Sequence, residues 1–442
     1  MFTKITKIYF ACIIVLFSVI LAPRLSYGKA FKNKITADAG GTINIAVAVP
    51  AEGRFSYYSK QFINGLLLSL RNAGSHKIRY IIINLPVNAG AARVGYIFSY
   101  LAKKKIGAVV GPIFAGQMKY FASNSVKFKI PVITPSPVVS KKSTSPFIFS
   151  YGMTLKQEIR TEMKYAGYDN IRSVSVIYPD NGYGLKLLGY INRYSKKYGI
   201  RVLNATAYGD KTADFFYNFD SIVRFKKKES GRLSKAEETQ IGITPYNLMH
   251  GITKSKPDIP FNGLFVLGTP SKLELILTQL MYYNITGFPI FGLSSLDSRP
   301  FIEKYGFYMQ NAIFPDGFFK HDENKTVKKF NSAYKKNYGE MPNILSAEGY
   351  DIGGIIIKAA KTLHNRQDSS VSAEYPPSYG QAQSSNPQVK NINASMFYKA
   401  VLSVKSFKGV CGASRLTGNR FRKSLYLFKY KGNKIYILES PF

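Results

Sequence analysis

Residues 42–58 read TINIAVAVPAEGRFSYY, and this stretch decides the fold class. Its first part, 42–49, is mostly apolar, as expected of a strand buried on both faces of a sheet. Residues 58–70 follow with apolar side chains at helical spacing. A buried strand that leads directly into a helix is the repeating unit of a parallel α/β sheet.

The same unit recurs along the chain in two series. In the first series we expect strands at 78–85, 106–110 and 130–134, with helices at 91–102 and 116–126. The second series begins with a helix at 156–168. We expect its strands at 173–178, 201–208, 263–268, 289–293 and 312–315, and further helices at 183–198 and 271–283. The sequence therefore predicts an α/β protein with two doubly wound parallel-sheet lobes.

The N-terminus has the pattern of an export signal. A basic start is followed by an apolar run at 8–22 and by the small residues Gly28 and Ala30. This pattern predicts a signal peptide at 1–30 that is cleaved after Ala30, and hence a periplasmic protein. An uncleaved anchor is the alternative. A lipid anchor is disfavoured because Cys12 lies inside the apolar run.

The chain is strongly basic, with 61 Lys and Arg against 25 Asp and Glu and a net charge of +36. Export argues against nucleic acid as the partner, and the basic residues are spread along the chain. A diffuse basic surface is the favoured interpretation, and anionic cell-wall polymers or lipid headgroups stay open as partners. After signal cleavage Cys411 is the single cysteine left, so no intramolecular disulfide is expected.

Two polar segments interrupt the α/β pattern. Residues 225–256 are charged and poorly periodic, and residues 365–393 are rich in Ser, Gln, Pro and Asn. The second segment is predicted to be a disordered insertion in the first lobe. Near the C-terminus, 425–430 and 434–438 are predicted to pair as a hairpin.

The sequence contains no recognisable catalytic or metal-binding motif. His76, His250, His321 and His364 are isolated from other ligand residues. Nucleophile-elbow, phosphate-loop and dinucleotide-binding glycine motifs are also missing. We therefore expect no enzyme activity, no metal and no cofactor, although a triad assembled from distant residues stays open.

Loops that follow the predicted strands have small or aromatic residues and lead into helices. In open parallel sheets, ligands bind beyond the carboxyl ends of the strands, where helix N-termini present backbone amides. The predicted ligand-binding residues in these loops are Tyr58, Ala115, Gly116, Ser136, Tyr183 and Thr269. The backbone amides of Ala115 and Gly116 can hold an anionic group without a hydroxyl.

In the order of its motifs, the chain resembles the leucine/isoleucine/valine-binding protein family, which has the type I periplasmic binding fold. The resemblance is carried by 53–65, 108–112, 130–136, 149–154, 347–351 and 407–412.

This resemblance implies two lobes joined by three crossings. The first lobe would comprise 42–151 and 318–406, and the second 152–317 and 407–442. It also implies capture of a small ligand, an amino acid or a small carboxylate or amide, for an ABC permease.

The family's ligand contacts carry over unevenly. Tyr58 and Tyr183 match aromatic walls of the family's cleft. Ala115 stands where amino-acid binders have a serine, and Val138 where they have a threonine. The family's acidic residue near Ser294 is also missing. Because a zwitterion without such partners pays for its desolvation, an amino acid is disfavoured as the ligand.

A second resemblance is to the penicillin-binding protein activator subgroup of the same fold, whose lobes bind a cell-wall synthase. It is carried by 213–215, 261–266, 280–287, 312–314 and 316–319. Activators often have a helical-repeat region before this domain, and the sequence has no such repeat. The sequence thus favours a transport-type binding protein, with an activator-like protein as the alternative.

Overall fold

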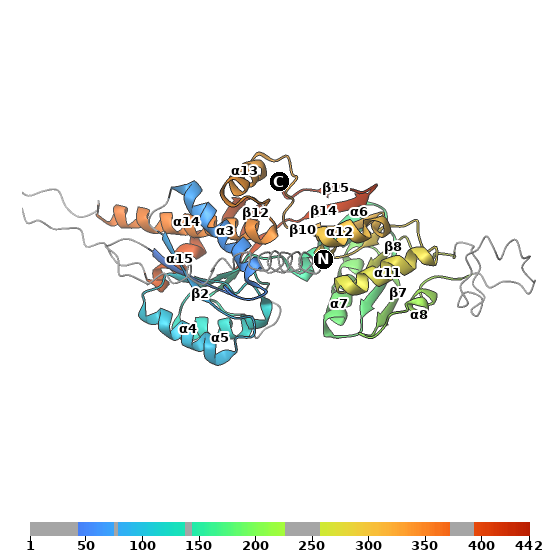
Figure 1. Cartoon of the computed structure of the whole chain (residues 1–442), viewed down its shortest axis with the longest axis horizontal. Coiled ribbons are helices and arrows are strands. Elements are labelled where there is room, and N and C mark those ends of the chain that lie inside the picture. Colours follow the sequence, from blue (N-terminus) through green and yellow to red (C-terminus); the bar gives the residue numbers. More distant parts are fainter. Residues whose placement is uncertain (1–42, 75–77, 138–143, 226–256, 372–392) are drawn as a thin grey trace, which may run out of the picture. The chain divides into compact units, whose positions relative to one another are not determined.

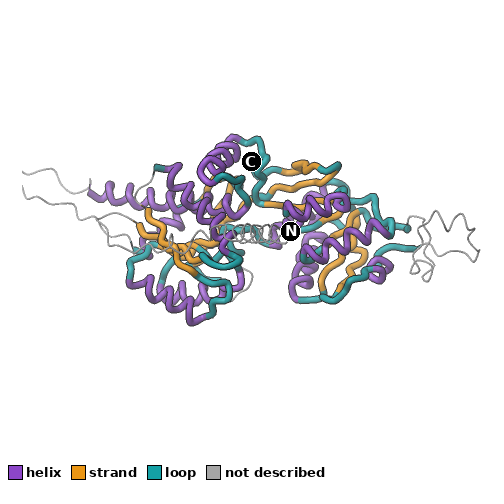
Figure 2. Tube along the Cα trace, in the orientation of Figure 1, coloured by secondary structure: helices purple, strands orange, loops and turns teal. Residues whose placement is uncertain are grey.

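The computed structural model describes residues 43–74, 78–137, 144–225, 257–371 and 393–442, traced in Figure 2. The predicted signal peptide 1–30, Val138 and nearly all of the polar segment 225–256 lie outside these ranges. The chain forms two compact units. One contains the chain up to Ser136, Ser140–Phe149 and Ile352–Val404, and the other contains Pro137–Val139, Ser150–Asp351 and Lys405–Phe442. Apart from 137–139, the chain passes between the units at three points.

The first sheet has eight strands in the order β11-β12-β13-β5-β4-β3-β1-β2. Strands β1 to β4 pair in parallel, and β11, β12 and β13 pair antiparallel. The strands are β1 (Ile43–Val49), β2 (Ile78–Asn84), β3 (Ala108–Val110), β4 (Val132–Thr134), β5 (Ile148–Ser150), β11 (Ser406–Gly409), β12 (Gly412–Thr417) and β13 (Arg420–Lys423).

Helices cover both faces of this first sheet. In Figure 1, α4 (Ala91–Lys103) and α5 (Met118–Phe128) lie on one face. The other face has α3 (Ser56–Ala73), α14 (Ile344–Val371) and α15 (Ala394–Ser403). Ile43, Ile45 and Val47 of β1 are fully buried between the layers, which explains why the opening strand is mostly apolar.

The second sheet has seven strands in the order β15-β14-β10-β9-β8-β6-β7. Its parallel part is flanked by the antiparallel hairpin of β14 and β15. The strands are β6 (Ser173–Pro179), β7 (Arg201–Tyr208), β8 (Gly263–Val266), β9 (Ile290–Phe291), β10 (Ala312–Asp316), β14 (Tyr426–Lys431) and β15 (Lys434–Glu439).

Two hydrophobic cores flank the second sheet. One is formed with α6 (Leu155–Tyr168) and α7 (Gly182–Tyr198), and includes Ile159 and Ile191. The other is formed with α8 (Phe216–Asp220), α11 (Pro270–Tyr282) and α12 (Arg299–Tyr305), and includes Phe219 and Ile276. Short 3-10 turns at Ser294–Asp297 and Gly306–Met309, and helix α13 (Lys325–Tyr338), complete the connections.

The predicted α/β class with two parallel-dominated sheets is confirmed. The C-terminal hairpin is also confirmed, with Gly432 and Asn433 both at positive φ in its turn. The sequence does not predict strands β5, β11, β12 and β13, because each is short and none contains a long apolar run. Helix α14 continues to Val371, through the first residues of the segment predicted to be a disordered insertion.

Residues 318–351 group with the second unit and not, as the sequence predicts, with the first lobe. The reason is a set of contacts to the C-terminal segment. The Tyr426 hydroxyl donates to Asp322 over 2.6 Å, and Lys423 pairs with Glu348 over 3.0 Å.

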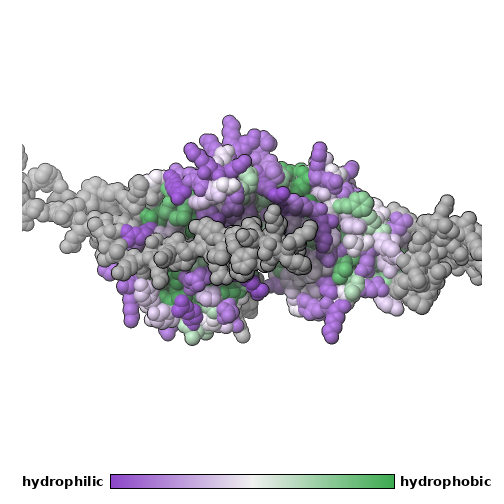
Figure 3. Space-filling view, in the orientation of Figure 1, coloured by the Kyte–Doolittle hydropathy of each residue, from purple (hydrophilic) through white to green (hydrophobic). Residues whose placement is uncertain are grey.

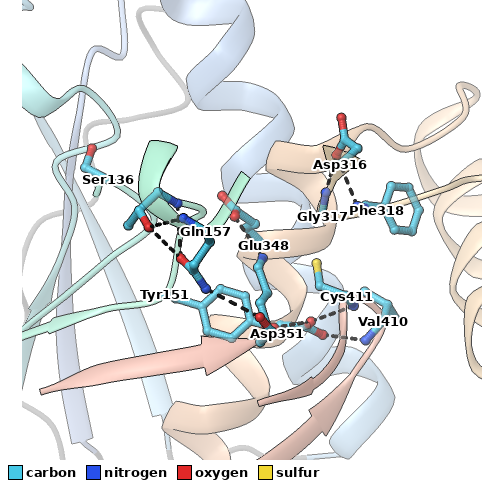
Figure 4. Close-up of polar contacts among 12 residues, drawn as sticks. Ser136, Tyr151, Gln157, Asp316, Gly317, Phe318, Glu348, Asp351, Val410 and Cys411 are labelled. Carbon is cyan, nitrogen blue, oxygen red and sulfur yellow. Dashed lines mark hydrogen bonds and ion pairs between the residues drawn. The ribbon is translucent and has the colours of Figure 1, made fainter. Parts of the chain in front are cut away.

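A buried polar cluster lies beside the three crossings, with all of its residues in the second unit (Figure 4). The Asp351 carboxylate accepts hydrogen bonds from the Tyr151 hydroxyl over 2.6 Å and from the amides of Val410 and Cys411 over 2.8 and 2.9 Å. A Cβ at Gly409 would overlap this carboxylate, so only glycine fits there. One side chain thereby joins three segments far apart in the sequence.

The same cluster contains a buried ion pair. The side chains of Lys423 and Glu348 are 0% and 7% exposed, and the Lys423 amino group lies 4.4 Å from the centre of the Tyr151 ring. Burial opposes the charge of Lys423, but its acidic neighbours outweigh that effect and raise its pKa. Burial raises the pKa of Glu348, and the charge of Lys423 partly offsets this. The pair therefore depends on both partners.

We predict that Lys423→Met will destabilise the protein by about 3–5 kcal/mol, because Glu348 would be left buried without its partner. The double variant Lys423→Met/Glu348→Leu should recover much of this loss. Urea unfolding followed by circular dichroism measures both. The control is Arg299→Ala, which breaks the exposed Arg299–Glu303 pair and should cause no measurable change. A Lys423→Met variant as stable as the control would contradict the prediction.

Candidate functional site

In the first unit, loops at the carboxyl ends of β1 and β3 bring aromatic rings together. The Phe114 ring centre lies 5.3 Å from that of Phe55 and 6.2 Å from that of Tyr58, both in edge-on geometry. The Arg54 guanidinium lies 4.7 Å from the centre of the Phe55 ring. Tyr58 is 44% exposed, so the cluster presents an aromatic surface next to the strand ends.

Ser136 follows β4 and is 2% exposed. Its amide donates to the Thr134 hydroxyl oxygen over 2.9 Å, and that hydroxyl donates to the Pro112 carbonyl over 2.7 Å. The Ser136 hydroxyl itself has no hydrogen-bond partner among the described residues. A buried hydroxyl without a partner is costly, so Ser136 is a candidate for contact with a ligand.

Ala115 and Gly116 begin the 3-10 turn Ala115–Gln117, which precedes α5. Gly116 is exposed, and a Cβ added to it would meet no other atom. Ala115 has no hydroxyl to offer a ligand carboxylate. The turn therefore offers backbone groups at this strand end and no polar side chain from these two residues.

In the second unit, Tyr183 lies in the first turn of α7. The side chain of Asn181 caps this helix by accepting from the amides of Tyr183 and Gly184 over 3.0 and 3.1 Å. Tyr183 is 41% exposed. Burial of its hydroxyl, together with the negative charge of Glu158, raises the pKa of Tyr183 to about 12. Tyr183 therefore stays neutral at physiological pH and can donate a hydrogen bond.

Thr269 is the N-cap residue of α11, which follows β8. It is exposed, and its hydroxyl lies 3.1 Å from that of Ser271. Of the six predicted ligand residues, Tyr58, Ala115, Gly116 and Ser136 thus lie at strand ends of the first sheet. Tyr183 and Thr269 lie at strand ends of the second sheet. Ligand binding by these residues stays a prediction.

A group of acidic residues in the second unit was not identified from the sequence. Glu158 accepts from the Ser294 amide over 2.9 Å. Asp297 and Asp316 interact through their side chains, and Asp316 caps the amides of Gly317 and Phe318 (Figure 4). Burial raises the pKa of Glu158 and, together with the charge of Asp297, that of Asp316.

Glu158 changes the comparison with the amino-acid binders. The family's acidic residue has no match at Ser294 in the sequence, but the structure brings the Glu158 carboxylate there from α6. The two residues are far apart in the sequence, so only folding shows their contact. A signal existed in α6, where Glu158 and Glu162 share a face with Ile159 and Met163, which are fully buried.

Glu162 is fully buried, and neither carboxylate oxygen has a hydrogen-bond partner of normal geometry among the described residues. Burial and the charge of Glu158 raise its pKa well above the usual value, and the nearby Gly292 amide offsets this only slightly. Within the described part of the chain, no group of three or more His, Cys, Asp or Glu side chains is arranged to hold a metal ion.

The family model described as "LppC putative lipoprotein" matches residues 28–352 of this chain. The chain belongs to the LppC family. No curated protein matches the sequence. A bacterial lipoprotein carries its lipid on a cysteine. The N-terminal cysteine of this chain, Cys12, lies outside the described residues. In the described part of the chain, no helix combines the length and apolar character needed to cross a membrane.

Solved structures share the fold of this LppC protein at low sequence identity. One, titled a "putative branched-chain amino acid ABC transporter" from Rhodospirillum rubrum, has a TM-score of 0.68 and 17% identity over 90% of this chain and 100% of its own. LivJ of Streptococcus pneumoniae, in complex with isoleucine, has a TM-score of 0.58 and 18% identity over 90% and 99%.

A third solved structure is an ABC transporter solute-binding protein of R. palustris in complex with benzoate. It has a TM-score of 0.59 and 12% identity over 91% of this chain and 97% of its own. Together these likenesses confirm the type I periplasmic binding fold. At such identities they establish the fold alone.

We predict that Glu162→Gln will flatten the pH dependence of stability. A group whose pKa is higher in the folded state than in the unfolded state contributes to stability. This contribution is complete below the unfolded-state pKa and is lost as the pH rises through the folded-state pKa. The wild type should therefore lose melting temperature between pH 5 and pH 8 relative to Glu162→Gln. Thermal unfolding across this range measures the effect, with the exposed Glu52→Gln as control. Parallel curves for wild type and Glu162→Gln would refute it.

Proposed function

We propose that this LppC-family protein is a non-enzymatic binding protein of the cell envelope that acts by binding a cell-wall synthase. The family match carries the proposal, because it covers most of the chain, whereas the transport proteins are similar in fold alone. It fits the resemblance to penicillin-binding protein activators. In this proposal the signal peptide is cleaved after Ala30, and the mature chain works in the periplasm.

The local chemistry at Ala115 favours synthase binding over capture of an amino acid. Without a side-chain hydroxyl at this strand end, an amino-acid carboxylate would have only backbone donors there. Loss of a hydrogen bond to a charged group costs about 1.5–3 kcal/mol, which weakens a small ligand much more than a large protein interface. The basic net charge also favours association with the anionic surroundings of the cell wall.

Solute capture for an ABC permease is the second candidate. The Ser136 hydroxyl favours it, because this buried group has no partner among the described residues and lies in a predicted ligand loop. The aromatic cluster of Phe55, Tyr58 and Phe114 supplies an apolar wall of the kind that binds a small apolar body. Glu158 beside Ser294 would serve a cationic group in this candidate.

The mature chain, 31–442, should bind a purified bifunctional penicillin-binding protein of the same organism with a dissociation constant in the micromolar range or below. Biolayer interferometry measures the affinity, and glycan polymerisation by the synthase measures activation. Stimulation on addition of the mature chain is the expected result. Neither binding nor stimulation would overturn the proposed function.

A thermal-shift screen tests the second candidate with amino acids, small carboxylates and amides. A ligand at ~1,000 times its dissociation constant should stabilise the protein by about 4 kcal/mol. If solute capture is correct, Ser136→Ala and Tyr58→Ala should each reduce the shift, while the exposed Tyr168→Ala should not. If the synthase role is correct, the Ser136→Ala variant should retain synthase binding. An unchanged shift in both site variants would exclude the predicted ligand residues.

A further inference from the structure

A cavity of about 420 Å³ lies in the second unit, between the first turns of α6 and the segments around β13 and the end of β15. Helix α6 lies beside β14 and β15 in Figure 1, in keeping with the ion pair between Lys164 and Glu439. All lining residues belong to 150–351 and 405–442, so the cavity is complete within one unit. None of the six predicted ligand residues lines it.

The residue spacing on α6 and β13 places basic side chains along this cavity. Lys156, Arg160 and Lys164 are spaced four apart on α6 and therefore share one face of the helix. Arg420 and Arg422 are spaced two apart on β13 and share one face of the strand. The helix face and the strand both line the same cavity.

The opposite sides of these two elements explain why the basic side chains face outward. On α6, Ile159 and Met163 are fully buried in the core against the second sheet. On β13, Phe421 and Lys423 point inward, and the Lys423 amino group is committed to Glu348. The remaining basic side chains therefore lie on the cavity side.

The charge in the cavity wall is poorly balanced. Glu439 is the single acidic residue among the described residues that line it, and it pairs with Lys164 over 3.3 Å. Partial burial and the nearby charge of Arg422 lower the pKa of Arg420, as expected for crowded like charges. Holding like charges together costs free energy, and a multivalent anion placed among them would offset that cost.

Cavity size and donor types identify the ligand chemistry. A volume of this order holds a small molecule or a headgroup and is too small for a folded protein segment. Guanidinium groups match the oxygens of phosphate in pairs, and the Thr161 and Ser424 hydroxyls in the wall add neutral donors. A monocarboxylate would leave most of the positive charge uncompensated.

We propose that this cavity binds a phosphate- or pyrophosphate-bearing group. The group arrives either as a free anion or as the headgroup of an envelope lipid. Binding needs neither the predicted ligand residues nor a synthase, so it is independent of the proposed function. It assigns a specific site to a basic surface that the sequence presents only as diffuse charge.

Isothermal titration of the mature chain with inorganic pyrophosphate, at constant ionic strength, tests the site. We expect saturable binding, and the double variant Arg160→Ala/Arg422→Ala should weaken it about tenfold or more, because charge-assisted hydrogen bonds are lost. The matched control is Arg172→Ala/Lys304→Ala, which removes two exposed cations of the same unit that do not line the cavity. This control should bind as the wild type does.

Sedimentation with phosphatidylcholine vesicles containing phosphatidylglycerol separates the two sources. Binding of pyrophosphate alone identifies a free anion, and vesicle binding lost only in the Arg160→Ala/Arg422→Ala variant identifies a headgroup. Equal loss in both double variants, or no binding to either probe, overturns the site. Synthase binding by the Arg160→Ala/Arg422→Ala variant should be unchanged, which separates this result from the proposed function.

Discussion

The hydrogen bonds of Asp351 are the constraint on which the arrangement of the chain at its crossings depends. One carboxylate accepts from Tyr151 at the first crossing and from the amides of Val410 and Cys411 after the third. Asp351 itself stands at the second crossing. Because the carboxylate is fully buried, losing any one of these donors would expose its desolvation cost.

This cluster and the acidic group around Glu158 use buried charge in different ways. Asp351, Glu348 and Lys423 have partners for their charges, so the cluster stabilises the second unit. Glu162 has no such partner among the described residues, and burial together with the charge of Glu158 raises its pKa. Carboxyl groups of the second kind are often associated with function.

The surface of the described residues is mostly polar. Hydrophilic residues predominate on the face seen in Figure 3, and hydrophobic ones form small separate patches. Several exposed aromatic rings have a basic side chain close to them, as with Arg93 and Tyr96 or Lys164 and Tyr168. Basic side chains are thus spread widely over the surface. In one place, α6 and β13 bring several of them together around a single cavity.

The sequence by itself determined the α/β class, the two series of strands and helices and the C-terminal hairpin, because apolar periodicity and turn residues are local properties. It also placed Ser136 in the loop after one strand, and Tyr58 and Tyr183 at the helix starts that follow two others. Tertiary structure alone decided that Glu158 meets Ser294, that Lys423 meets Glu348 and that two basic faces share one cavity. Each of these contacts joins residues far apart in the chain. The physical reason is that the partner of a charged side chain is set by tertiary packing, which brings both groups together away from water. Local sequence patterns do not contain this information.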